Sequence, residues 1–473
     1  MKNTIFYLLF IAILFSACVE DFLDREPISD LTEGNFFKTG ADAEAALVAA
    51  YDALQSEYYI FDLFTNGDVI SDNCYAGGDN PNNFQLDEFT TTTTNVNVQR
   101  DWGYLYEGIS RANAVLDNVG DIKSPDLSDE RKQEILGEAS FLRATHYFQL
   151  VNLYGEVPLV LEKVNTTDPA IIYQARSTVQ DVYNAIITDL EFALENAPVG
   201  TDQPQRVSKG AAEAMLAKVY AYLPNPDWSM VDEYASRVIS GGSYSLLPSF
   251  DHLWDGQHEN SAEAIFEIQY IGGTNEANWG PQLWLPPSIT GDSWRKFNTP
   301  SNDLLQAYDD AGDQVRKQSS IIIQNSLPWQ DGNFPDGNIP FPYKQRAANG
   351  WSSPNNVILI RLAHIILLQA EAKAELIQLD ASKALVNQVR RRVNLPATTA
   401  SSQLELLKAI MLERRLELAF EGHRWYDLKR SGKALEVMDA LDKGYQITES
   451  KLLFPIPQSE LDRNPSLTQN SGY

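Results

Sequence analysis

Apolar residues recur every three or four positions along most of this chain, the spacing that places them on one face of an α-helix. Turn-forming and helix-capping residues divide the pattern into segments of ordinary helix length. The predicted helices span residues 41–55, 128–154, 182–194, 208–222, 357–376, 381–392 and 404–420. The segment 357–376 is apolar on nearly every face, which predicts a helix that is buried on all sides.

Several of these helices have capping residues at their predicted ends. Ser128 precedes the second helix, and Gly155 follows its last residue. Ser177 and Gln180 have the spacing of a capping box, and Ser208 precedes an alanine-rich helix. The capping pattern therefore predicts where these helices begin.

Paired helices joined by short turns predict a mainly α fold of the α-solenoid type. The alanine-rich segments 211–223 and 363–376 suit close helix packing of the tetratricopeptide kind. No fixed repeat of about 34 residues runs through the chain. We therefore expect tetratricopeptide-like helix pairs without a strict sequence repeat.

Two stretches interrupt the helical pattern. Residues 65–99 are polar and rich in Gly, Asn and Thr, which predicts a long loop. Residues 246–354 form a larger break, with eight of the 23 prolines between Pro281 and Pro342. Within it, residues 264–270 alternate in the manner of a strand. We expect a large, irregular, loop-rich insert with a few short strands, and such long segments are usually functional.

Residues 413–432, ERRLELAFEGHRWYDLKRSG, place many charges among large apolar side chains. Gly422 predicts a helix end with a left-handed residue, followed by a new helix. Because an unpaired buried charge is costly, the charges of the two helices should pair with one another. Our interpretation is a structural ion-pair network, and a catalytic cluster is the alternative.

The charge balance limits the class of ligand. The chain has 64 acidic and 37 basic side chains and a formal net charge of −27. Nucleic-acid binding requires a positive surface, so a nucleic-acid partner is excluded, and anionic lipid surfaces are disfavoured. Neutral ligands remain the natural class.

The first residues predict export. Residues 1–17 contain a lysine and an apolar run too short to span a bilayer as a helix, as in a secretory signal peptide. Cys18 follows two small residues in a sequence that resembles a bacterial lipobox, with Phe15 where Leu is more usual. Cys18 would then carry the lipid anchor, and an ordinary signal peptide with a chance cysteine is the alternative. Cys74 is the one other cysteine, so no disulfide framework is expected.

Motifs of catalysis are absent from the sequence. No nucleophile elbow, Gly-rich phosphate loop or zinc-protease motif occurs, so we predict no catalytic residue, no cofactor and no enzymatic activity. The five histidines lack the usual spacing of metal ligands, and no metal site is predicted. His364 lies in an apolar helix and is interpreted as a core residue. His252 and His258 lie in a loop, and a metal site there is the alternative.

Tryptophans concentrate in the irregular insert. Six of the nine lie between Trp254 and Trp351, among many Asn and Gln residues. Pyranose rings present flat C–H faces that aromatic rings can cover, and their hydroxyl groups need fixed polar partners. The predicted sugar-contacting residues are Trp279, Trp284, Trp294 and Trp329, with core packing as the alternative for each. Prolines that flank Trp279 and Trp284 stiffen the chain there.

Several motifs, in this order, resemble the SusD/RagB family of outer-membrane nutrient-binding lipoproteins of Bacteroidetes. They are Arg111-Ala112-Asn113, EASFLRA at 138–144, Arg176-Ser177-Thr178, the segment 413–432, FPIP at 454–457 and QNSGY at 469–473. Each motif is weak alone, but together they extend over nearly the whole chain. The resemblance implies tetratricopeptide-like helix pairs that carry an irregular ligand-binding region. It also implies a SusC-like TonB-dependent transporter as partner and no covalent chemistry.

The resemblance also implies a division of the chain. The expected parts are a signal peptide at 1–17 and a single unit at 18–473, with a helical scaffold at about 28–245 and 355–473 and a ligand-binding region at about 246–354 plus the loop 65–99. Because relatives place that loop near the ligand, Asp72, Asn73 and Tyr75 are expected on the opposite wall of the site.

The sequence thus predicts a lipoprotein on the outer face of the outer membrane, anchored through Cys18, that binds a polysaccharide or oligosaccharide. It would deliver this ligand to the SusC-like transporter. The acidic composition suggests a saline habitat, and hence a β-glucan such as laminarin. A lipid-anchored glycoside hydrolase or lyase and a peptide-binding protein of the RagB kind are the alternatives.

Overall fold

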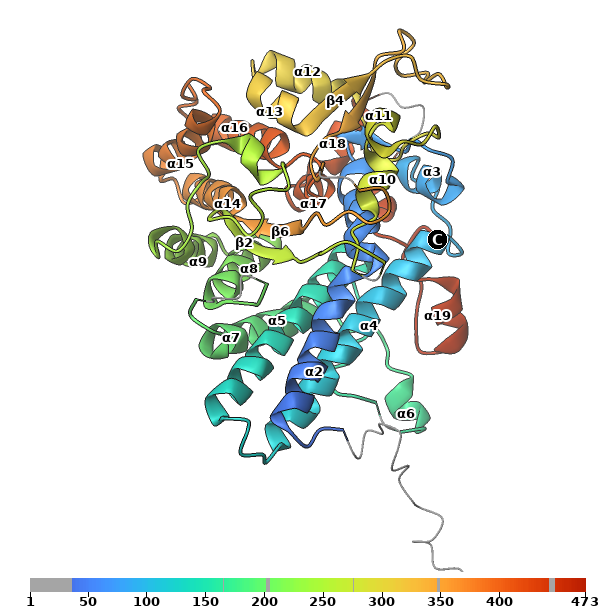
Figure 1. Ribbon diagram of the computed structural model, residues 1–473, viewed down its shortest axis with the longest axis vertical. Coiled ribbons are helices and arrows are strands. Elements are labelled where there is room, and N and C mark those ends of the chain that lie inside the picture. Colours follow the sequence, from blue (N-terminus) through green and yellow to red (C-terminus); the bar gives the residue numbers. More distant parts are fainter. Residues whose placement is uncertain (1–35, 165, 201–204, 275, 347–348, 442–446) are drawn as a thin grey trace, which may run out of the picture.

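The computed structural model of the chain describes residues 36–164, 166–200, 205–274, 276–346, 349–441 and 447–473. The predicted signal peptide and Cys18 lie outside the described residues. Figure 1 shows long helices side by side in the lower half of the molecule, with α12, α13 and β4 at its upper end. None of the described helices combines the length and the hydrophobicity needed to cross a bilayer.

Long helices form the scaffold. They are α2 (Gly40–Asp52), α4 (Val96–Asn118), α5 (Asp129–Tyr154), α7 (Val179–Asn196), α8 (Lys209–Tyr222), α9 (Trp228–Ser240), α14 (Leu362–Glu375), α15 (Leu379–Arg392) and α16 (Gln403–Glu417). Each packs against neighbours in this series: α5 lies against α4 and α7, α8 against α7 and α9, and α14 against α9, α15 and α16. The predicted mainly α, solenoid-like fold is confirmed.

Shorter elements complete the described chain. They are η2 (Ala53–Gln55), η3 (Tyr58–Asp62), η4 (Thr65–Val69), β1 (Cys74–Tyr75), α3 (Pro81–Asp87), η5 (Val119–Asp121), α6 (Pro169–Ile172), η6 (Phe250–Leu253), β2 (Ala264–Ile268), α10 (Gly280–Trp284), α11 (Pro287–Thr290), β3 (Thr299–Pro300), α12 (Asn302–Asp310), α13 (Gln314–Ser320), β4 (Ile321–Gln324), β5 (Ile339–Pro342), β6 (Val357–Arg361), α17 (Arg424–Arg430), α18 (Ala434–Asp439), η7 (Glu449–Lys451) and α19 (Gln458–Arg463). Most of those between η6 and β6 belong to the insert.

Helix caps lie close to the predicted positions. The Ser128 side chain caps α5, and Gly155 follows its end with a φ of +73°. Ser208 caps α8 as expected. The capping box predicted at Ser177 is wrong by one residue, because the Thr178 hydroxyl accepts the hydrogen bond at the start of α7. An N-cap oxygen satisfies a backbone N–H group that the first helical turn leaves free.

The prediction of a long loop at 65–99 is wrong. The segment contains η4, β1, α3 and the start of α4. Asn80 and Asn95 cap α3 and α4 with their side-chain oxygens. Pro81 fits the first turn of α3, where no backbone N–H donor is needed. Part of the polar composition that suggested a loop, at Asn80 and Asn95, is therefore N-cap chemistry.

The predicted helix 357–376 is wrong in its first five residues, which form β6. The β-branched residues Val357, Ile358 and Ile360 of β6 pair with β2, and α14 begins only at Leu362. An apolar strand followed directly by a buried helix gives one unbroken apolar run. Hydrophobic spacing alone could not divide this run.

Within the described residues, short strands form three two-stranded antiparallel sheets: β1–β3, β2–β6 and β4–β5. The few short strands predicted for the insert are therefore present, and β2 occupies most of the predicted strand 264–270. Tyr75 of β1 lies opposite Thr299 of β3. This pairing brings the segment 65–99 against the insert.

A cluster of charges lies in the interior where the scaffold meets the insert. The buried ion-pair cluster comprises Glu413, Glu417 and Glu421 with Arg316, Lys344, Arg361 and Arg392. Arg361 donates to Glu417 at 2.6 Å and to Glu421 at 2.7 Å. Lys344, from the insert, contacts Glu421 at 2.6 Å. Glu413 and Glu417 are one turn apart on α16, so they project from one side of that helix, and Glu421 lies in the turn that follows it.

The segment 413–432 forms the structural network that its sequence predicts. Arg414 of α16 pairs with Asp427 of α17 at 2.8 Å. Gly422 has the expected positive φ of +73°, but α16 already ends at Glu417, and a turn that includes Gly422 joins it to α17. Burial alone would raise the pKa of Asp427, but Arg414 and Arg430 outweigh it and hold the pKa well below its usual range. These charges pair across a helix junction in the interior.

Candidate functional site

Two tryptophans of the insert are exposed and lie against each other. Trp294 is 36% exposed and Trp351 is 55% exposed, whereas Trp254 and Trp284 are only 4% exposed. The ring centroids of Trp294 and Trp351 are 6.1 Å apart, and their planes differ by 12°. We call these two residues the tryptophan pair. They form a nearly parallel aromatic surface that faces solvent.

A buried cation holds one ring of the tryptophan pair. Lys296 Nζ lies 4.4 Å from the centroid of the Trp294 ring, within the range of a cation–π contact. The same ammonium group contacts Asp292 at 2.6 Å and donates to the Gln282 carbonyl at 2.7 Å. Burial lowers the pKa of Lys296, although Asp292 opposes this shift. The ring is therefore positioned by groups that belong to the folded insert.

Trp329 and Tyr75 lie close to this surface. Arg295, next to Trp294, donates to the Gln330 carbonyl at 2.9 Å, which ties the two segments together. Trp329 and Tyr75 are half-buried and pack in one apolar cluster with Phe334, Ile339 and Phe341. Burial raises the pKa of Tyr75, and the nearby charge of Asp331 adds to the effect. The structure thus brings three of the predicted residues, Trp294, Trp329 and Tyr75, to one side of the insert.

Trp279 and Trp284 pack inward against Phe61. The Trp284 ring lies 6.3 Å from the Phe61 ring with an angle of 10° between their planes. Trp279 is half-buried, and its ring also lies 6.3 Å from the Phe61 ring, with an angle of 30° between their planes. Trp284 is the last residue of α10, and its ring also contacts Phe64. Trp284 therefore packs in the core, which was the alternative to sugar contact, and its ring is not an exposed sugar platform.

Asp72 and Asn73 face the interior. Asp72 is 2% exposed and accepts two hydrogen bonds of 2.7 Å from Arg424. Asn73 is fully buried, and its side-chain oxygen accepts from Arg415 at 3.0 Å. Burial raises the pKa of Asp72, but Arg424 and Arg415 outweigh it, so the pKa lies below its usual value. These two residues hold the loop against the charged segment 413–432 and do not reach solvent as a wall.

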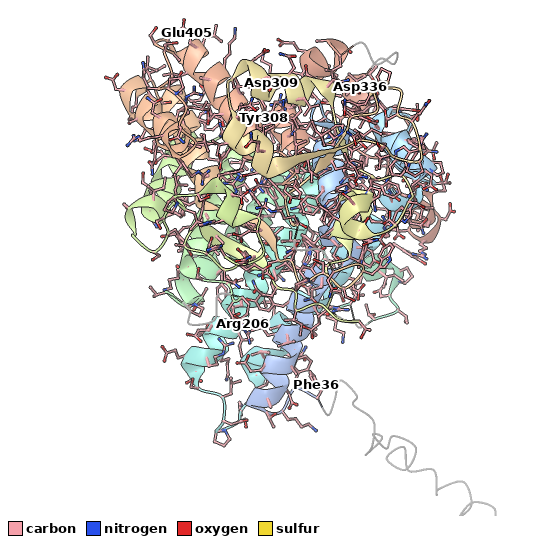
Figure 2. The ribbon with its side chains drawn as sticks, turned by 45° about the horizontal axis from the view of Figure 1, so that its top comes forward. Phe36, Arg206, Tyr308, Asp309, Asp336 and Glu405 are labelled. Atoms are coloured by element: carbon pink, nitrogen blue, oxygen red, sulfur yellow. The ribbon has the colours of Figure 1, made fainter. Side chains whose placement is uncertain are left out.

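Two surface hollows lie beside β2, and the sequence pattern predicted neither of them. One, of about 360 Å³, is lined by Tyr51, Gln55 and Gln269, and the other, of about 350 Å³, by Ser208, Tyr244 and Asn260. They share Arg206, Phe266 and Glu267 as lining residues. Figure 2 shows Arg206 in the lower half of the molecule, away from Asp336 of the insert. No tryptophan lines either hollow, so they are separate from the tryptophan pair.

Asp62 and Asp101 form a buried carboxyl pair with a perturbed pKa, as the acid of a glycosidase would have. Asp62 and Asp101 are fully buried, and burial together with the Asp62 charge raises the pKa of Asp101 well above its usual value. Asp62 accepts from Arg100 at 2.7 Å, and Asp101 accepts from Asn66 at 2.8 Å. A glycosidase needs two carboxyl groups that reach the glycosidic bond. This pair is sealed inside the scaffold and cannot reach one.

The histidines fall into two groups. His364 and His146 are fully buried, as the core interpretation of His364 predicted, and His364 lies 4.4 Å from His423, which is 6% exposed. Burial lowers the pKa of His146 to about 3. His252 and His258 are exposed and lie together with Asp255. This last group is the one set of metal-ligand side chains found among the described residues.

A helical scaffold that presents exposed aromatic rings on an irregular insert is the architecture of a ligand-binding protein of the helical-repeat class. Residues 21–221 match the family described as "Starch-binding associating with outer membrane", and residues 334–473 match the SusD family. The chain is 30% identical to SusD-like protein P2 of Formosa agariphila, over 98% of this chain and 99% of that protein. It is 29% identical to SusD-like protein P38 of the same organism, over 100% and 99% of the two chains. The chain belongs to the SusD family.

Solved structures agree with this assignment. A protein described as a laminarin binding SusD-like protein is 29% identical and superimposes with a TM-score of 0.78, over 92% of this chain and all of that chain. A SusD superfamily protein of Bacteroides vulgatus superimposes with a TM-score of 0.80 at 23% identity, over 93% of this chain and all of that chain, which supports the fold. The two family matches leave residues 222–333 between them, and this gap contains much of the insert.

Proposed function

We propose that this protein binds a neutral polysaccharide or oligosaccharide through the tryptophan pair and performs no covalent chemistry on it. The observation that carries the proposal is the exposed, nearly parallel arrangement of Trp294 and Trp351. An aromatic face of this kind covers the C–H face of a pyranose ring. The net charge of −27 favours a neutral ligand over an anionic one.

The ligand region of this proposal is 246–354 together with part of 65–99. Trp329 and Tyr75, in the cluster that Arg295 links to the tryptophan pair through Gln330, supply further aromatic surface, and Trp279 is half-buried in the same insert. Gln330, Asn333 and Asn349 are exposed polar residues in the same part of the insert, and their amide groups can exchange hydrogen bonds with sugar hydroxyls. Trp284, Asp72 and Asn73 support this region from inside.

We propose a β-glucan of the laminarin type as ligand. The support is the 29% identity to a laminarin binding SusD-like protein. Affinity electrophoresis in gels that contain laminarin tests this, with starch as the comparison glycan. Retardation by another glycan alone would replace laminarin while keeping the function class.

The tryptophan pair is tested by Trp294→Ala and Trp351→Ala. Each should weaken laminarin retardation by about tenfold, which corresponds to about 1.4 kcal/mol of binding free energy. Tyr173→Ala is a matched control, because Tyr173 is 37% exposed and follows α6 at the opposite end of the molecule (Figure 1). Unchanged retardation in the double variant would refute the platform.

The same purified protein tests the enzymatic alternative. Laminarin and starch incubated with it should show no new reducing ends over a day. Release of reducing ends at a rate proportional to protein concentration would instead establish a lipid-anchored hydrolase.

A peptide ligand is disfavoured because the insert offers paired aromatic rings, whereas extended peptides are held mainly by backbone hydrogen bonds.

We further propose an outer-membrane location through a lipid on Cys18 and a SusC-like TonB-dependent transporter as partner. The support is the family description "Starch-binding associating with outer membrane" and the lipobox-like sequence at Cys18. In this arrangement the protein captures glycan at the cell surface and passes it to the transporter. Co-purification of such a transporter from outer-membrane extracts tests the partnership, and its absence under mild detergent would contradict it.

A further inference from the structure

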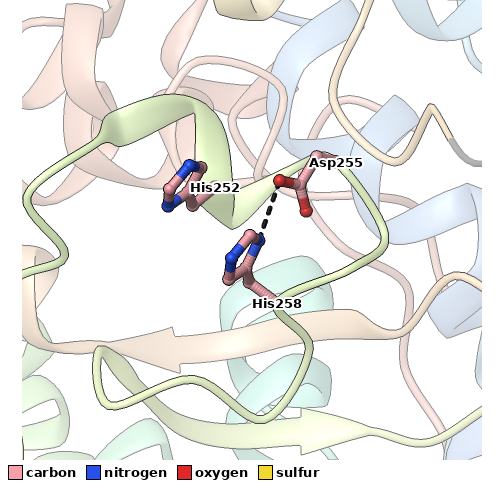
Figure 3. A group of neighbouring side chains, drawn as sticks. All are labelled: His252, Asp255 and His258. Carbon is pink, nitrogen blue, oxygen red and sulfur yellow. Dashed lines mark hydrogen bonds and ion pairs between the residues drawn. The ribbon is translucent and has the colours of Figure 1, made fainter.

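Three side chains with metal-ligand chemistry meet on the surface of the insert. His252, Asp255 and His258 each offer a ligand atom, and these atoms all lie within 4.8 Å of one another. Figure 3 shows the two imidazole rings beside the Asp255 carboxylate. The ring centroids are 4.1 Å apart with an angle of 6° between the planes, and His258 Nδ1 lies 2.8 Å from Asp255 Oδ2. The group has the sequence form H-x-x-D-x-x-H.

The backbone that carries His252 is held in place by its buried neighbours. His252 belongs to η6, whose neighbours Phe250 and Trp254 are 1% and 4% exposed. Lys344 Nζ lies 4.4 Å from the Trp254 ring centroid, and Arg392 lies 5.2 Å from that of Phe250. Both cations belong to the buried ion-pair cluster, so the backbone that carries His252 is anchored to the interior.

The loop that carries His258 is held on both sides. Asp255 Oδ1 accepts from the backbone N–H of Gln257 at 2.8 Å. The backbone N–H of Asn260 donates to Glu267 at 3.0 Å, and Glu259 accepts from the backbone N–H of Asn356 at 2.8 Å. Local hydrogen bonds thus fix the turn, while both imidazoles remain exposed to solvent. This arrangement presents ligand groups on a preorganised backbone.

The ligand nitrogens are largely available. Hydrogen bonds among the described residues engage only Nδ1 of His258, through Asp255. The remaining ring nitrogens of the two histidines can bind an ion without breaking a hydrogen bond within the protein, although the two rings must leave their stacked arrangement. Two imidazoles and one carboxylate are the protein ligands of known four-coordinate Zn²⁺ sites, with water at the fourth position.

We propose that His252, Asp255 and His258 bind one divalent transition-metal ion of the Zn²⁺ class. One ring nitrogen of each histidine and one oxygen of Asp255 serve as ligands, and water completes the coordination. With metal–ligand distances of about 2.0–2.2 Å, tetrahedral ligand atoms lie about 3.3 Å apart. Because parallel rings cannot both direct a lone pair at one ion, the exposed rings turn out of their stacked arrangement when the ion binds.

The donor set also selects against the hard cations. Ca²⁺ prefers six to eight oxygen ligands and Mg²⁺ an octahedral shell of oxygens, but this group offers a single carboxylate. Imidazole ligands favour Zn²⁺, Cu²⁺ and Ni²⁺ instead. The site is therefore expected to retain Zn²⁺ in the presence of excess Ca²⁺.

Calorimetric titration of the full mature chain, purified without a histidine tag and treated with chelator, tests the proposal with Zn²⁺ alone. We expect one equivalent to bind. His252→Ala and His258→Ala should each weaken binding at least tenfold, and Asp255→Asn should weaken it less. Asp336→Asn, an exposed carboxylate elsewhere on the insert (Figure 2), should leave binding unchanged. The other three histidines and Cys74 are buried, so they do not add surface sites.

A second readout locates the ion. Zn²⁺ should protect His252 and His258 from modification by diethyl pyrocarbonate, as measured by peptide mass spectrometry. The proposal would be overturned if Zn²⁺ binding survives in the His252→Ala/His258→Ala double variant. It would also be overturned if the unaltered chain binds no Zn²⁺ at roughly 0.1 mM, which corresponds to a binding free energy weaker than about 5.5 kcal/mol. Trp294→Ala should retain Zn²⁺ binding, so the metal site and the glycan platform stand or fall separately.

Discussion

Each charged residue of the buried ion-pair cluster stabilises the junction because its partners are also present. Glu417 is fully buried and contacts Arg316, Arg361 and Arg392. Burial alone would raise its pKa, but Arg392 and Arg361 outweigh this effect and hold the pKa well below the usual range. If one carboxylate is lost, its three arginines keep their charge in a medium of low polarity.

Glu417→Gln is therefore expected to be strongly destabilising. Breaking a buried ion pair from one side costs about 3–5 kcal/mol of the free energy of unfolding. Glu436→Gln is the matched control, since its pair with Lys433 lies at the surface and its loss should barely move the midpoint. Urea unfolding of the three proteins measures the difference. Equal midpoints for the two variants would contradict the structural role of the cluster.

The residues of the candidate site show where sequence reasoning ends. The clustering of tryptophans in the insert was visible, and it led to Trp294 and Trp329. Which rings face solvent depends on how α10 packs against Phe61, and no local pattern encodes this contact between distant segments. Trp351 was counted among the clustered tryptophans but was not predicted to contact sugar. Asp255 was missed, although the spacing H-x-x-D-x-x-H was a usable signal.

Among the elements, the turn between α16 and α17 makes a very close backbone contact with the segment that contains η4. Gly422 has a φ of +73°, and a Cβ atom there would lie 2.9 Å from the Leu63 carbonyl oxygen, just before η4. Gly67 of η4 approaches the same turn, with a built Cβ only 2.3 Å from Gly422 backbone atoms. Two backbones can approach this closely only where neither residue has a side chain.

Gly422→Ala and Gly432→Ala separate this crowding from backbone strain. Both glycines have positive φ, but nothing lies within 4 Å of a Cβ atom at Gly432, where φ is +67°. Gly432→Ala should cost about 1 kcal/mol of stability from the backbone alone. Gly422→Ala should cost about 2–4 kcal/mol, because strain and overpacking add. Thermal unfolding of both variants measures this, and equal losses would refute the close contact.

Element boundaries were predictable where a cap and a spacing agree. Ser128, Gly155 and Ser208 mark the ends of α5 and the start of α8 because a side-chain oxygen or a left-handed residue is needed there. β6 was not predicted, because its pairing partner, β2, lies about a hundred residues earlier in the chain. Local spacing carries no information about such a partner.

For the whole molecule, the buried carboxylates that pair with arginine or lysine make stability sensitive to acid, whereas burial raises the pKa of Asp101 and Glu267 and acts in the opposite direction. The pKa values of Glu417, Glu421 and Asp427 in the folded protein lie below the ordinary values of 4.5 and 3.8. Near pH 4 these three groups therefore bind more protons in the unfolded chain than in the folded one. The stabilisation is complete above the ordinary carboxyl values and is lost as the pH falls below them.

We expect the free energy of unfolding to fall steadily between pH 5 and pH 3. The fall should be shallower in Glu417→Gln, because that variant has lost one of the depressed carboxyl groups. Urea unfolding at a series of pH values measures both slopes. Parallel curves for the two proteins would show that the cluster does not cause the acid sensitivity.

The position of the buried ion-pair cluster has a consequence for engineering ligand choice in this family. Arg316 and Lys344 come from the insert, whereas Glu413, Glu417 and Glu421 come from the scaffold. An insert transplanted from a relative would keep the recipient folded only if it brings equivalent cations to these positions. Exchange of the insert between relatives therefore requires matching interior charges, and Glu263 of the insert, which pairs with Arg361 and Arg392, belongs to the same requirement.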